Sequence, residues 1–276
     1  MLDQVKPESR FLETGGFRSH YIEQGEGDVV ILLHGGGPGA DGWGNWFGCL
    51  PLFATHFRTI ALDLVGYGGS EAPEGYVYSQ ENRNRQLIAF IEALGEGPVS
   101  VVGNSMGGAT ALGAAMLRPE LINNLVLMGS AGLNYSVGRV GEAMKPLAGY
   151  DYTREGMARI ARHLGGKNFQ AVPGMVDYRF DLATRPERKA SFDGINKWII
   201  ANRGLHYEED AIAAVKTRTL VFNGKDDPIV ILAQAMRFLE LLENSTGFIL
   251  PHCGHWAMLE APAIFSSQTI QFLKGY

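Results

Sequence analysis

Ser105 is the residue whose surroundings most clearly predict chemistry. It stands in the segment VSVVGNSMGG, residues 99–108, where a β-rich run meets the pattern G-x-S-x-G and passes into a helical pattern. This context is typical of a strained turn that exposes a serine nucleophile, and Gly103 and Gly107 would remove side chains that collide there. The helix expected to begin at Met106 would point its positive end at the serine. The alternative is a glycine-rich turn of purely structural value.

A second glycine-rich loop, HGGGPG at residues 34–39, follows the apolar run 29–33. Glycines there allow the backbone to approach a reacting carbonyl without a Cβ in the way. We predict that the amides of Gly36 and Met106 form an oxyanion hole. A phosphate-binding loop is the alternative, but no Lys-Ser or Lys-Thr pair follows the glycines. His34 is expected to be a buried, hydrogen-bonded anchor of the loop rather than a catalyst.

The acid and the base of a serine triad are expected in loops after late strands, in that order along the chain. The segment NGKDDP, residues 223–228, supplies Asp227 as the acid on motif spacing. Asp226 is the alternative, although it could equally serve a turn or a helix cap. The segment PHCGHW, residues 251–256, supplies His255 as the base.

Short β-rich runs alternate with helical patterns along the chain, which predicts a parallel sheet with helices on both faces. The predicted strands are residues 29–33, 59–62, 99–102, 124–128, 219–222 and 246–250, and the predicted helices are 80–94, 106–117 and 232–242. Residues 17–23 are expected to add an antiparallel hairpin strand at the edge of the sheet.

No strand pattern occurs from about residue 132 to 207, where Met, Arg, Tyr and Phe appear at helical spacing between glycine and proline interruptions. We interpret this segment as an inserted helical lid over the crevice at the carboxyl edge of the sheet, where open α/β sheets bind ligands. The predicted domains are a core formed by residues 1–132 and 209–276 and a lid formed by residues 133–208.

The composition argues against several classes of protein. With 276 residues, 46% of them hydrophobic, the chain can bury a full core, but its apolar runs are far shorter than the roughly 20 residues that cross a bilayer. The net charge of −5 without a basic block argues against nucleic-acid binding. The polar N-terminus shows no secretory signal, so we expect a cytoplasmic protein with reduced thiols at Cys49 and Cys253. Scattered histidines without a C-x-x-C pair predict no metal site, and the chemistry needs no cofactor.

Four segments resemble the meta-cleavage product hydrolases, which split a carbon–carbon bond in 2-hydroxy-6-oxohexa-2,4-dienoates. They are HGGGPGADGWGNW at 34–46, VGNSMGGAT at 102–110, LVLMGSAGL at 125–133 and PHCGHWAMLE at 251–260. Within the family they are most similar to the biphenyl- and carbazole-pathway enzymes. The resemblance covers nearly the whole core and implies the α/β-hydrolase fold: a mostly parallel eight-stranded sheet with helices on both faces and an inserted helical lid.

The resemblance also assigns substrate-binding positions, motif by motif. They fall on Gly37, Asn45, Asn104, Arg179 and Trp256, beside Gly36 of the oxyanion loop. A planar guanidinium suits the carboxylate of a dienoate, and an indole suits a conjugated chain. Structural alternatives stay open: Asn45 could cap a helix, Asn104 could serve only the elbow turn, and Trp256 could be packing. A lid arginine, taken alone, is usually solvated.

The implied substrate is a small molecule, and the implied reaction begins with enol-to-keto tautomerisation, which places an electron sink beside the bond to be broken. Ser105 would then attack the 6-oxo carbonyl, or His255 would activate water directly to give a gem-diol, and both routes remain open. The products would be 2-hydroxypenta-2,4-dienoate and a carboxylic acid. The biphenyl and carbazole likeness and the small residues Ala131 and Gly132 predict an aryl 6-substituent. The family further suggests a homodimer or larger homo-oligomer.

A carboxylesterase or lipase-like enzyme on the same triad is the main competing function. A haloalkane dehalogenase or an epoxide hydrolase would need a carboxylate at the elbow, where this chain has Ser105. A cofactor-free haloperoxidase and a ligand-sensing protein with slow turnover are further alternatives. Arg179 together with Asn45 discriminates the carbon–carbon hydrolase from a plain esterase, because only a substrate with a carboxylate needs the cation.

Overall fold

One mixed β-sheet organises the protein, whose structure, a computed structural model, describes residues 4–134 and 139–275. The strands lie in the order β1-β2-β4-β3-β5-β6-β7-β8. Their bounds are β1 (Arg10–Thr14), β2 (Phe17–Gln24), β3 (Val29–Leu33), β4 (Arg58–Leu62), β5 (Val99–Asn104), β6 (Ile122–Met128), β7 (Arg218–Gly224) and β8 (Ser245–Leu250). β2 pairs antiparallel with β1 and β4, and all pairs from β4 to β8 are parallel. The predicted eight-stranded, mostly parallel sheet is confirmed.

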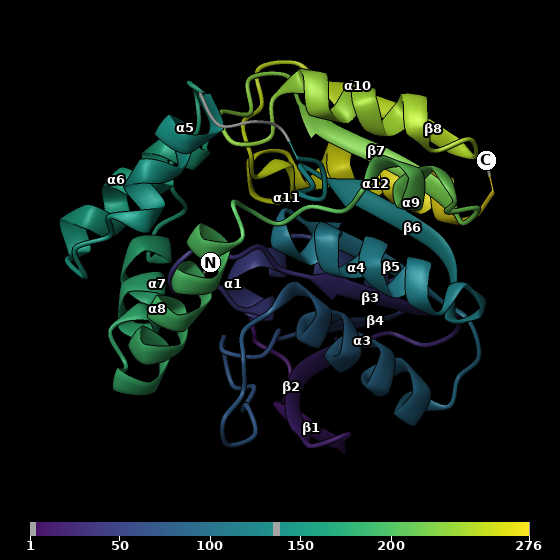
Figure 1. Cartoon of the computed structure of the whole chain (residues 1–276), viewed down its shortest axis with the longest axis horizontal. Helices are drawn as coiled ribbons and strands as arrows, with labels where there is room; N and C mark the ends of the chain where they lie inside the picture. Colours follow the sequence, from purple (N-terminus) through teal and green to yellow (C-terminus); the bar gives the residue numbers. More distant parts are fainter. Residues whose placement is uncertain (1–3, 135–138, 276) are drawn as a thin grey trace.

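Helices cover both faces of this sheet (Figure 1). One face carries α3 (Gln80–Leu94), α4 (Met106–Leu117), α9 (Glu209–Ala213) and α10 (Leu232–Leu241), and the other carries α1 (Gly42–Trp46), α2 (Leu50–Ala54), α11 (Ala257–Glu260) and α12 (Pro262–Leu273). In β3, Val30 and Leu32 join one hydrophobic core, whereas Ile31 and Leu33 join the other. Because successive strand side chains point to opposite faces, a strand covered on both sides must be apolar throughout.

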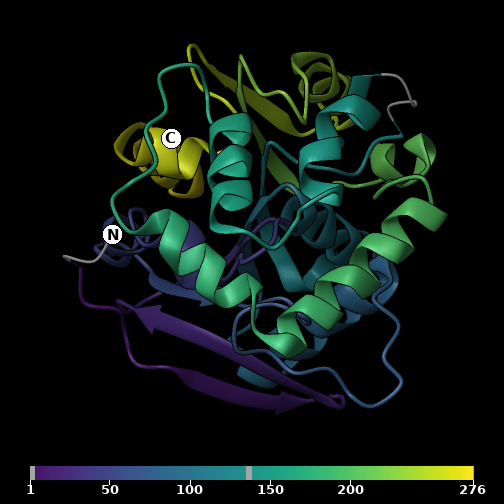
Figure 2. The same cartoon turned by 90° about the vertical axis from the view of Figure 1, so that its left-hand side faces the viewer.

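A further group of helices comes between β6 and β7. It consists of α5 (Arg139–Ala148), α6 (Arg154–Leu164), α7 (Met175–Ala183) and α8 (Pro186–Ala201). These helices stand at one end of the sheet in Figure 1, and Figure 2 shows them in front of the core. The Thr153 hydroxyl caps α6 by accepting from the Gly156 amide, and Pro186 begins α8. All four helices fall within the predicted insertion, whose boundaries at 133 and 208 stay a prediction.

Some elements differ from those predicted. Residues 17–23, expected at the edge, belong to β2 inside the sheet, and β1 forms the edge. The mostly exposed sequence of β1, RFLET, contains no apolar run that could have predicted it. The short helices α1, α2 and α11 have too few residues to show periodicity. By contrast, the helices predicted at 80–94 and 106–117 are confirmed as α3 and α4. None of the helices in the two described ranges combines the length and the apolar character that spanning a membrane requires.

The sheet topology places the site. β3 has β4 as its neighbour on one side and β5 on the other, and Leu33 at the end of β3 lies in register with Gly103 in β5. The chain therefore leaves these neighbouring strands in opposite directions, which opens a crevice at their carboxyl ends. The glycine-rich loop after β3 and the G-x-S-x-G turn after β5 meet at this crevice.

Candidate active site

Ser105 occupies a sharp turn between β5 and α4. Its backbone has φ 54° and ψ −115°, a conformation that residues with a side chain rarely adopt. A Cβ added to Gly103 would lie 2.4 Å from the Gly107 carbonyl oxygen, and one added to Gly107 would lie 2.6 Å from the His34 carbonyl oxygen. Both glycines are therefore required by close backbone contacts, as the sequence predicts. These contacts hold the strained serine in place.

The glycine-rich loop after β3 lies against the first turn of α4. A Cβ added to Gly36 would come within 3.0 Å of the Met106 sulfur. The Tyr67 hydroxyl donates a 2.8 Å hydrogen bond to the Gly36 carbonyl oxygen and so restrains the Gly36–Gly37 peptide group. Gly36, Gly37 and Met106 line the same cavity as Ser105. The structure thus brings the residues predicted for the oxyanion hole next to the predicted nucleophile.

His34 anchors this loop, as expected. Its Nδ1 donates to the Gly35 carbonyl oxygen at 2.8 Å, and its Nε2 accepts from the Leu64 amide at 3.0 Å. This pair of bonds requires a neutral ring protonated on Nδ1. Burial lowers the pKa of His34, which favours the same neutral form. The ring joins the loop after β3 to the chain that follows β4.

Asp227 and His255 form a buried hydrogen-bonded pair at the carboxyl ends of β7 and β8. The distance from His255 Nδ1 to Asp227 Oδ2 is 2.8 Å. The carboxylate accepts, so Nδ1 carries the proton and Nε2 is left to accept one. The second oxygen, Oδ1, accepts from the amides of Ile229 and Val230 at 2.8 and 2.9 Å. Asp226 is exposed, so the geometry favours Asp227 over this alternative.

His255 lines the cavity together with Ser105, and Gly129 makes room for the histidine. A Cβ at Gly129, which has φ 50°, would lie 3.0 Å from Asp227 Oδ2 and 3.2 Å from His255 Nδ1. Within the described ranges no hydrogen bond joins the side chains of Ser105 and His255. Such catalytic contacts commonly tighten only when a substrate binds.

Glu260 supports the histidine loop, and the sequence reasoning missed it. Its carboxylate accepts from the amides of Gly254 and Trp256 at 3.0 and 3.2 Å, on either side of His255. It also accepts from the Gly166 amide of the inserted segment at 2.9 Å. Glu260 therefore joins the inserted helices to the loop that carries the imidazole. The residue closes the segment PHCGHWAMLE, but its type and position alone carry no signal for this role.

Arg179 of α7 reaches into the cavity from the inserted helices. Only 2% of its surface is exposed, and its Nη2 donates to Asn45 Oδ1 at 2.6 Å. The guanidinium carbon lies 4.7 Å from the centre of the Trp256 ring, within cation–π range. Burial lowers the pKa of Arg179 to about 10, while the Asp41 carboxylate acts to raise it, so the side chain stays cationic at neutral pH. Its Nε has no partner among the described residues.

These contacts decide some of the open alternatives. Arg179 is not a solvated surface residue, and Asn45 does not cap α1, because the N-cap of that helix is Asp41. Asn104 does serve the elbow: its Nδ2 donates to the carbonyl oxygens of Met128 and His255 at 3.2 and 3.4 Å. Only its Oδ1, which is buried and has no partner in the described part of the chain, is left for a ligand.

Most of the predicted site residues line one cavity, whose space of about 600 Å³ not occupied by atoms is partly open to solvent. Its polar lining includes Ser105, His255, Asn45, Asn104 and Arg179, with Trp256 beside them. Its apolar lining comes mainly from the inserted helices and includes Met144, Leu147, Leu164, Phe192, Ile199, Leu205 and Ile229. The small residues Ala131 and Gly132 do not line it, and a Cβ at Gly132 would face Phe238 and Leu112 instead. The argument for an aryl substituent from these two residues is therefore wrong.

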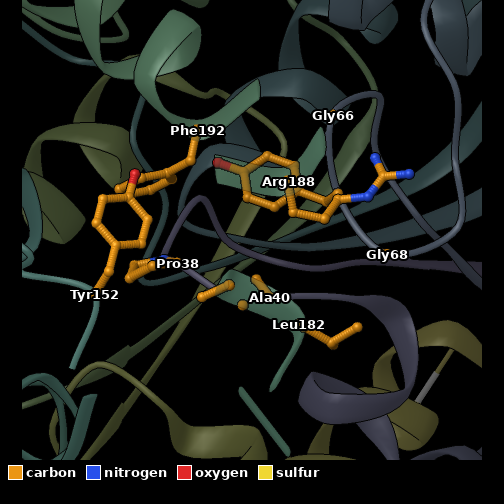
Figure 3. A pocket seen from close by; sticks show the side chains of 11 residues that line it. Pro38, Ala40, Gly66, Gly68, Tyr152, Leu182, Arg188 and Phe192 are labelled. Atoms are coloured by element: carbon orange, nitrogen blue, oxygen red, sulfur yellow. The ribbon is translucent and has the colours of Figure 1, made fainter. Parts of the chain in front are cut away.

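A second pocket adjoins the first, and Ala40 and Phe192 line both. Figure 3 shows its walls, with Tyr152 and Phe192 from the inserted segment, Pro38 from the glycine-rich loop and Ala40 directly after that loop. Most of the side chains around it are apolar, and none of the three predicted triad residues reaches it. The chemistry therefore belongs to the first cavity.

Two buried carboxylates beneath the site were not predicted. Asp41 accepts from the Gly44 amide at 2.6 Å and from the Tyr178 hydroxyl at 2.5 Å, and Asp63 lies 2.6 Å from His20 Nδ1. Burial, and then the charge of Asp63, raise the pKa of Asp41 to about 6. Burial also acts to raise the pKa of Asp63, but the hydrogen bond and charge of His20 outweigh it, so that pKa is lowered. Neither carboxylate stands in a motif that marks it in the sequence.

Comparison with known proteins gives matches over almost the whole chain. The profile of the family described as alpha/beta hydrolase fold matches residues 28–262. The 2-hydroxy-6-oxo-6-(2'-aminophenyl)hexa-2,4-dienoic acid hydrolase of Metapseudomonas resinovorans is 44% identical over 266 residues, which cover 96% of this chain and 90% of that protein. The 2-hydroxy-6-oxo-2,4-heptadienoate hydrolase of Pseudomonas putida F1 is 29% identical and covers 96% of each chain. A solved serine hydrolase involved in carbazole degradation matches with a TM-score of 0.90 and 42% identity, covering 97% of this chain and 98% of its own.

Asp41→Asn should stabilise the fold at neutral pH. A carboxylate whose pKa rises from 3.8 to about 6 on folding opposes folding once it ionises. The cost is absent below the unfolded pKa, grows between the two values and is complete above the folded one. Asparagine keeps an N-cap acceptor and cannot ionise. The Tm difference between variant and wild type should therefore grow from about pH 4 to pH 6 and then level off. Asp181→Asn, an exposed change on α7, is the control; a difference that shrinks over this range would refute the prediction.

Proposed function

The chain belongs to the α/β-hydrolase fold family and, within it, to the meta-cleavage product hydrolases, and from this we propose that it hydrolyses a carbon–carbon bond in 2-hydroxy-6-oxo-6-substituted hexa-2,4-dienoates. The products are 2-hydroxypenta-2,4-dienoate and a carboxylic acid. The family resemblance in the sequence is thereby confirmed, and a small-molecule substrate agrees with the size of this cavity. The individual roles below are inferred from the geometry of the site.

A buried cation in the cavity of the serine carries this proposal. In the described ranges the only hydrogen bond of the Arg179 side chain goes to the neutral amide of Asn45. A buried charge is costly unless an opposite charge pairs with it, so the site favours an anionic ligand. The C1 carboxylate of the dienoate can supply a paired, charge-assisted contact to the guanidinium. A neutral ester, the substrate of the competing carboxylesterase, has no use for this cation.

Ser105, His255 and Asp227 form the proposed catalytic triad. After ketonisation, Ser105 Oγ attacks C6 while His255 Nε2 takes its proton, and Asp227 stabilises the imidazolium. The amides of Gly36 and Met106 bind the oxyanion. When the C5–C6 bond breaks, its electron pair passes into the conjugated 2-oxo system, and the His255 imidazolium returns its proton to this dienolate, which releases the dienoate and leaves His255 neutral. Water deprotonated by His255 then hydrolyses the acyl-serine ester.

The strained serine favours this acyl-enzyme route over the gem-diol alternative. A turn with φ 54° at Ser105 has an energetic cost, and it places the hydroxyl where the amide of the following residue can assist an attack on a carbonyl. A mechanism in which His255 merely activates water would need neither the strained turn nor a hydroxyl at this position. The strained turn and the position of the Ser105 hydroxyl thus support covalent catalysis.

The apolar lining supports an aryl group at C6. Met144, Leu147 and Ile199 belong to this lining, and such side chains pack well against a ring. The more similar of the two hydrolases compared above acts on a 6-(2'-aminophenyl) compound at 44% identity, and the less similar one on a heptadienoate at 29%. We propose that this chain also prefers an aryl ketone.

We further propose that residues 133–208 act as a lid over this cavity, since α5–α8 contribute much of its lining. A homodimer or larger homo-oligomer is proposed on the family resemblance, and a cytoplasmic location on the two free, buried cysteines, Cys49 and Cys253. Sedimentation equilibrium and fractionation of the native host would test these two proposals.

The aryl preference should appear in the specificity constants. The 6-phenyl dienoate should have a higher kcat/KM than the 6-methyl compound, because an apolar subsite gains about 0.8 kcal/mol for each buried methylene-sized group. Loss of the dienolate absorbance measures both rates. A higher value for the 6-methyl compound would contradict the preference without affecting the triad.

Asp227→Asn and Asp226→Asn should differ sharply. Asparagine at 227 cannot stabilise an imidazolium and can hold the wrong histidine tautomer, so kcat should fall by several orders of magnitude. Asp226 is exposed, so its variant is the matched control and should retain most activity. The reverse ranking would transfer the acid role to Asp226.

Arg179→Ala is the central test of the function. Loss of a charge-assisted hydrogen bond costs about 1.5 to 3 kcal/mol, so kcat/KM for the dienoate should fall by roughly one to two orders of magnitude. Ketonisation should slow as well, since the cation stabilises the oxygen-rich end of the substrate. A neutral aryl ester should be hydrolysed almost as well as by the wild type.

Arg154→Ala removes an exposed lid arginine and serves as the control. Equal losses for the dienoate and the ester would make Arg179 a structural residue. No loss of activity on either substrate would mean that Arg179 does not bind the carboxylate, and the carboxylesterase would then be the better-supported function.

A further inference from the structure

Tyr178 and Arg179 are neighbours on α7, and both bind α1, but at its two ends. The Tyr178 hydroxyl donates to Asp41 Oδ2 at 2.5 Å, and Asp41 is the N-cap of α1. Arg179 donates to Asn45, near the last residue of that helix, at 2.6 Å. One contact would leave α7 free to pivot, whereas two contacts a helical turn apart fix its rotation. The tyrosine bond therefore constrains the residue that follows it.

Asp41 is a rigid acceptor because the core holds it firmly. Its other oxygen accepts from the Gly44 amide at 2.6 Å. Asp63, directly after β4, accepts from the Gly42 amide at 2.6 Å and from the Gly69 amide at 2.7 Å. A series of short hydrogen bonds thus runs from the end of β4 to the first turn of α1. The acceptor for the tyrosine is fixed to the sheet rather than to the inserted helices.

The approach of α7 to this part of the core is close. A Cβ at Gly39 would lie 2.0 Å from the Arg179 carbonyl oxygen, and one at Gly44 would lie 3.0 Å from Tyr178 Cε1. The N-cap of α7 is Gly174, which has no side chain that could cap the helix. Tertiary contacts of this kind, rather than the helix's own cap, therefore set where α7 lies.

Burial and the neighbouring Asp41 charge both raise the pKa of Tyr178, so its hydroxyl keeps its proton at neutral pH and can donate. Arg179, by contrast, has a long side chain with an unpartnered Nε and a single amide acceptor. The position of the guanidinium therefore depends on this one hydrogen bond, on the face of Trp256 and on where α7 lies, and a small displacement of a binding group can cost a large factor in rate.

We propose that the Tyr178–Asp41 hydrogen bond positions Arg179 for the carboxylate end of the substrate, which makes Tyr178 and Asp41 positioning residues. The inference rests on the proposed function, because the placement of the cation matters only for an anionic substrate. The two residues do not line the cavity and do not take part in the chemistry. Their effect is confined to how well the dienoate is held.

Tyr178→Phe tests this inference, since it removes the hydroxyl and keeps the ring. KM for the dienoate should rise by about three- to ten-fold, in keeping with a weakened charge-assisted contact, while kcat changes less. Hydrolysis of a neutral aryl ester should be unchanged. Tyr152→Phe is the matched control, because the Tyr152 hydroxyl donates to Asp193 of α8 at 2.6 Å and makes no hydrogen bond to α1 in the described part of the chain. It should change neither substrate.

A double-mutant cycle identifies the residue through which the hydroxyl acts. In an Arg179→Ala background, Tyr178→Phe should leave KM for the dienoate within about 1.5-fold, because the group that it positions is gone. An undiminished effect in that background would overturn the inference. Equal losses for the dienoate and the ester would also overturn it and would make the bond a general support of the lid.

The outcome for Arg179→Ala alone separates this inference from the proposed function. If that variant discriminates between the two substrates but Tyr178→Phe does not, the proposed function stands and the positioning role fails. If Arg179→Ala does not discriminate, the carboxylate assignment fails and the positioning role fails with it. Thermal melts of each variant confirm that the comparison is made between folded proteins.

Discussion

The strained conformation of Ser105 is the constraint on which the rest of the site depends. A residue with φ 54° persists only where its surroundings leave no alternative, and here they are close contacts between backbones. Gly103 lies against Gly107, and Gly107 lies against His34 in the loop after β3. The elbow can therefore form only if β3 and β5 are neighbours in the correct register. The same contacts bring the glycine-rich loop to the serine, so the proposed nucleophile and the proposed oxyanion donors are assembled by one packing requirement.

A second constraint comes from the buried guanidinium, and it acts on the inserted helices. Arg179 is stabilised by the Asn45 amide, by the face of Trp256 and, through space, by Asp41. These three groups come from α1 with its N-cap and from the loop that carries His255, both of which belong to the core and not to the inserted helices. The inserted helices thus contribute a charge that only the core can stabilise. The polar contacts of Arg179 inside the site therefore determine how the inserted helices pack on the core.

The features that could be predicted from the sequence are those determined by residues close together in the chain. The elbow, the glycine-rich loop and the helices at 80–94 and 106–117 could be recognised because their residue types are needed within a few positions of one another. Arg179 and Asn45 came only from the family resemblance, since 134 residues separate them. Asp41 and Tyr178 were missed for the same reason: an N-cap residue and a tyrosine of the inserted helices carry no special signal until folding places them together. The edge strand β1 was not predicted because its short, mostly exposed sequence shows no hydrophobic periodicity.

The separation of cation and nucleophile also bears on which carbon is attacked. A 2-hydroxy-6-oxo dienoate presents its carboxylate, its 2-oxygen and its 6-oxo group along one chain, so an unconstrained serine would meet more than one electrophilic carbon. If C1 is held at Arg179, the carbon that reaches Ser105 is set by the number of bonds between the two ends of the substrate. Because Arg179 belongs to α7 and Ser105 to the sheet, this length is fixed by how α7 docks on α1. Regioselectivity then follows from the packing of two helices, and the apolar lining of the cavity has only to accept whatever group C6 carries.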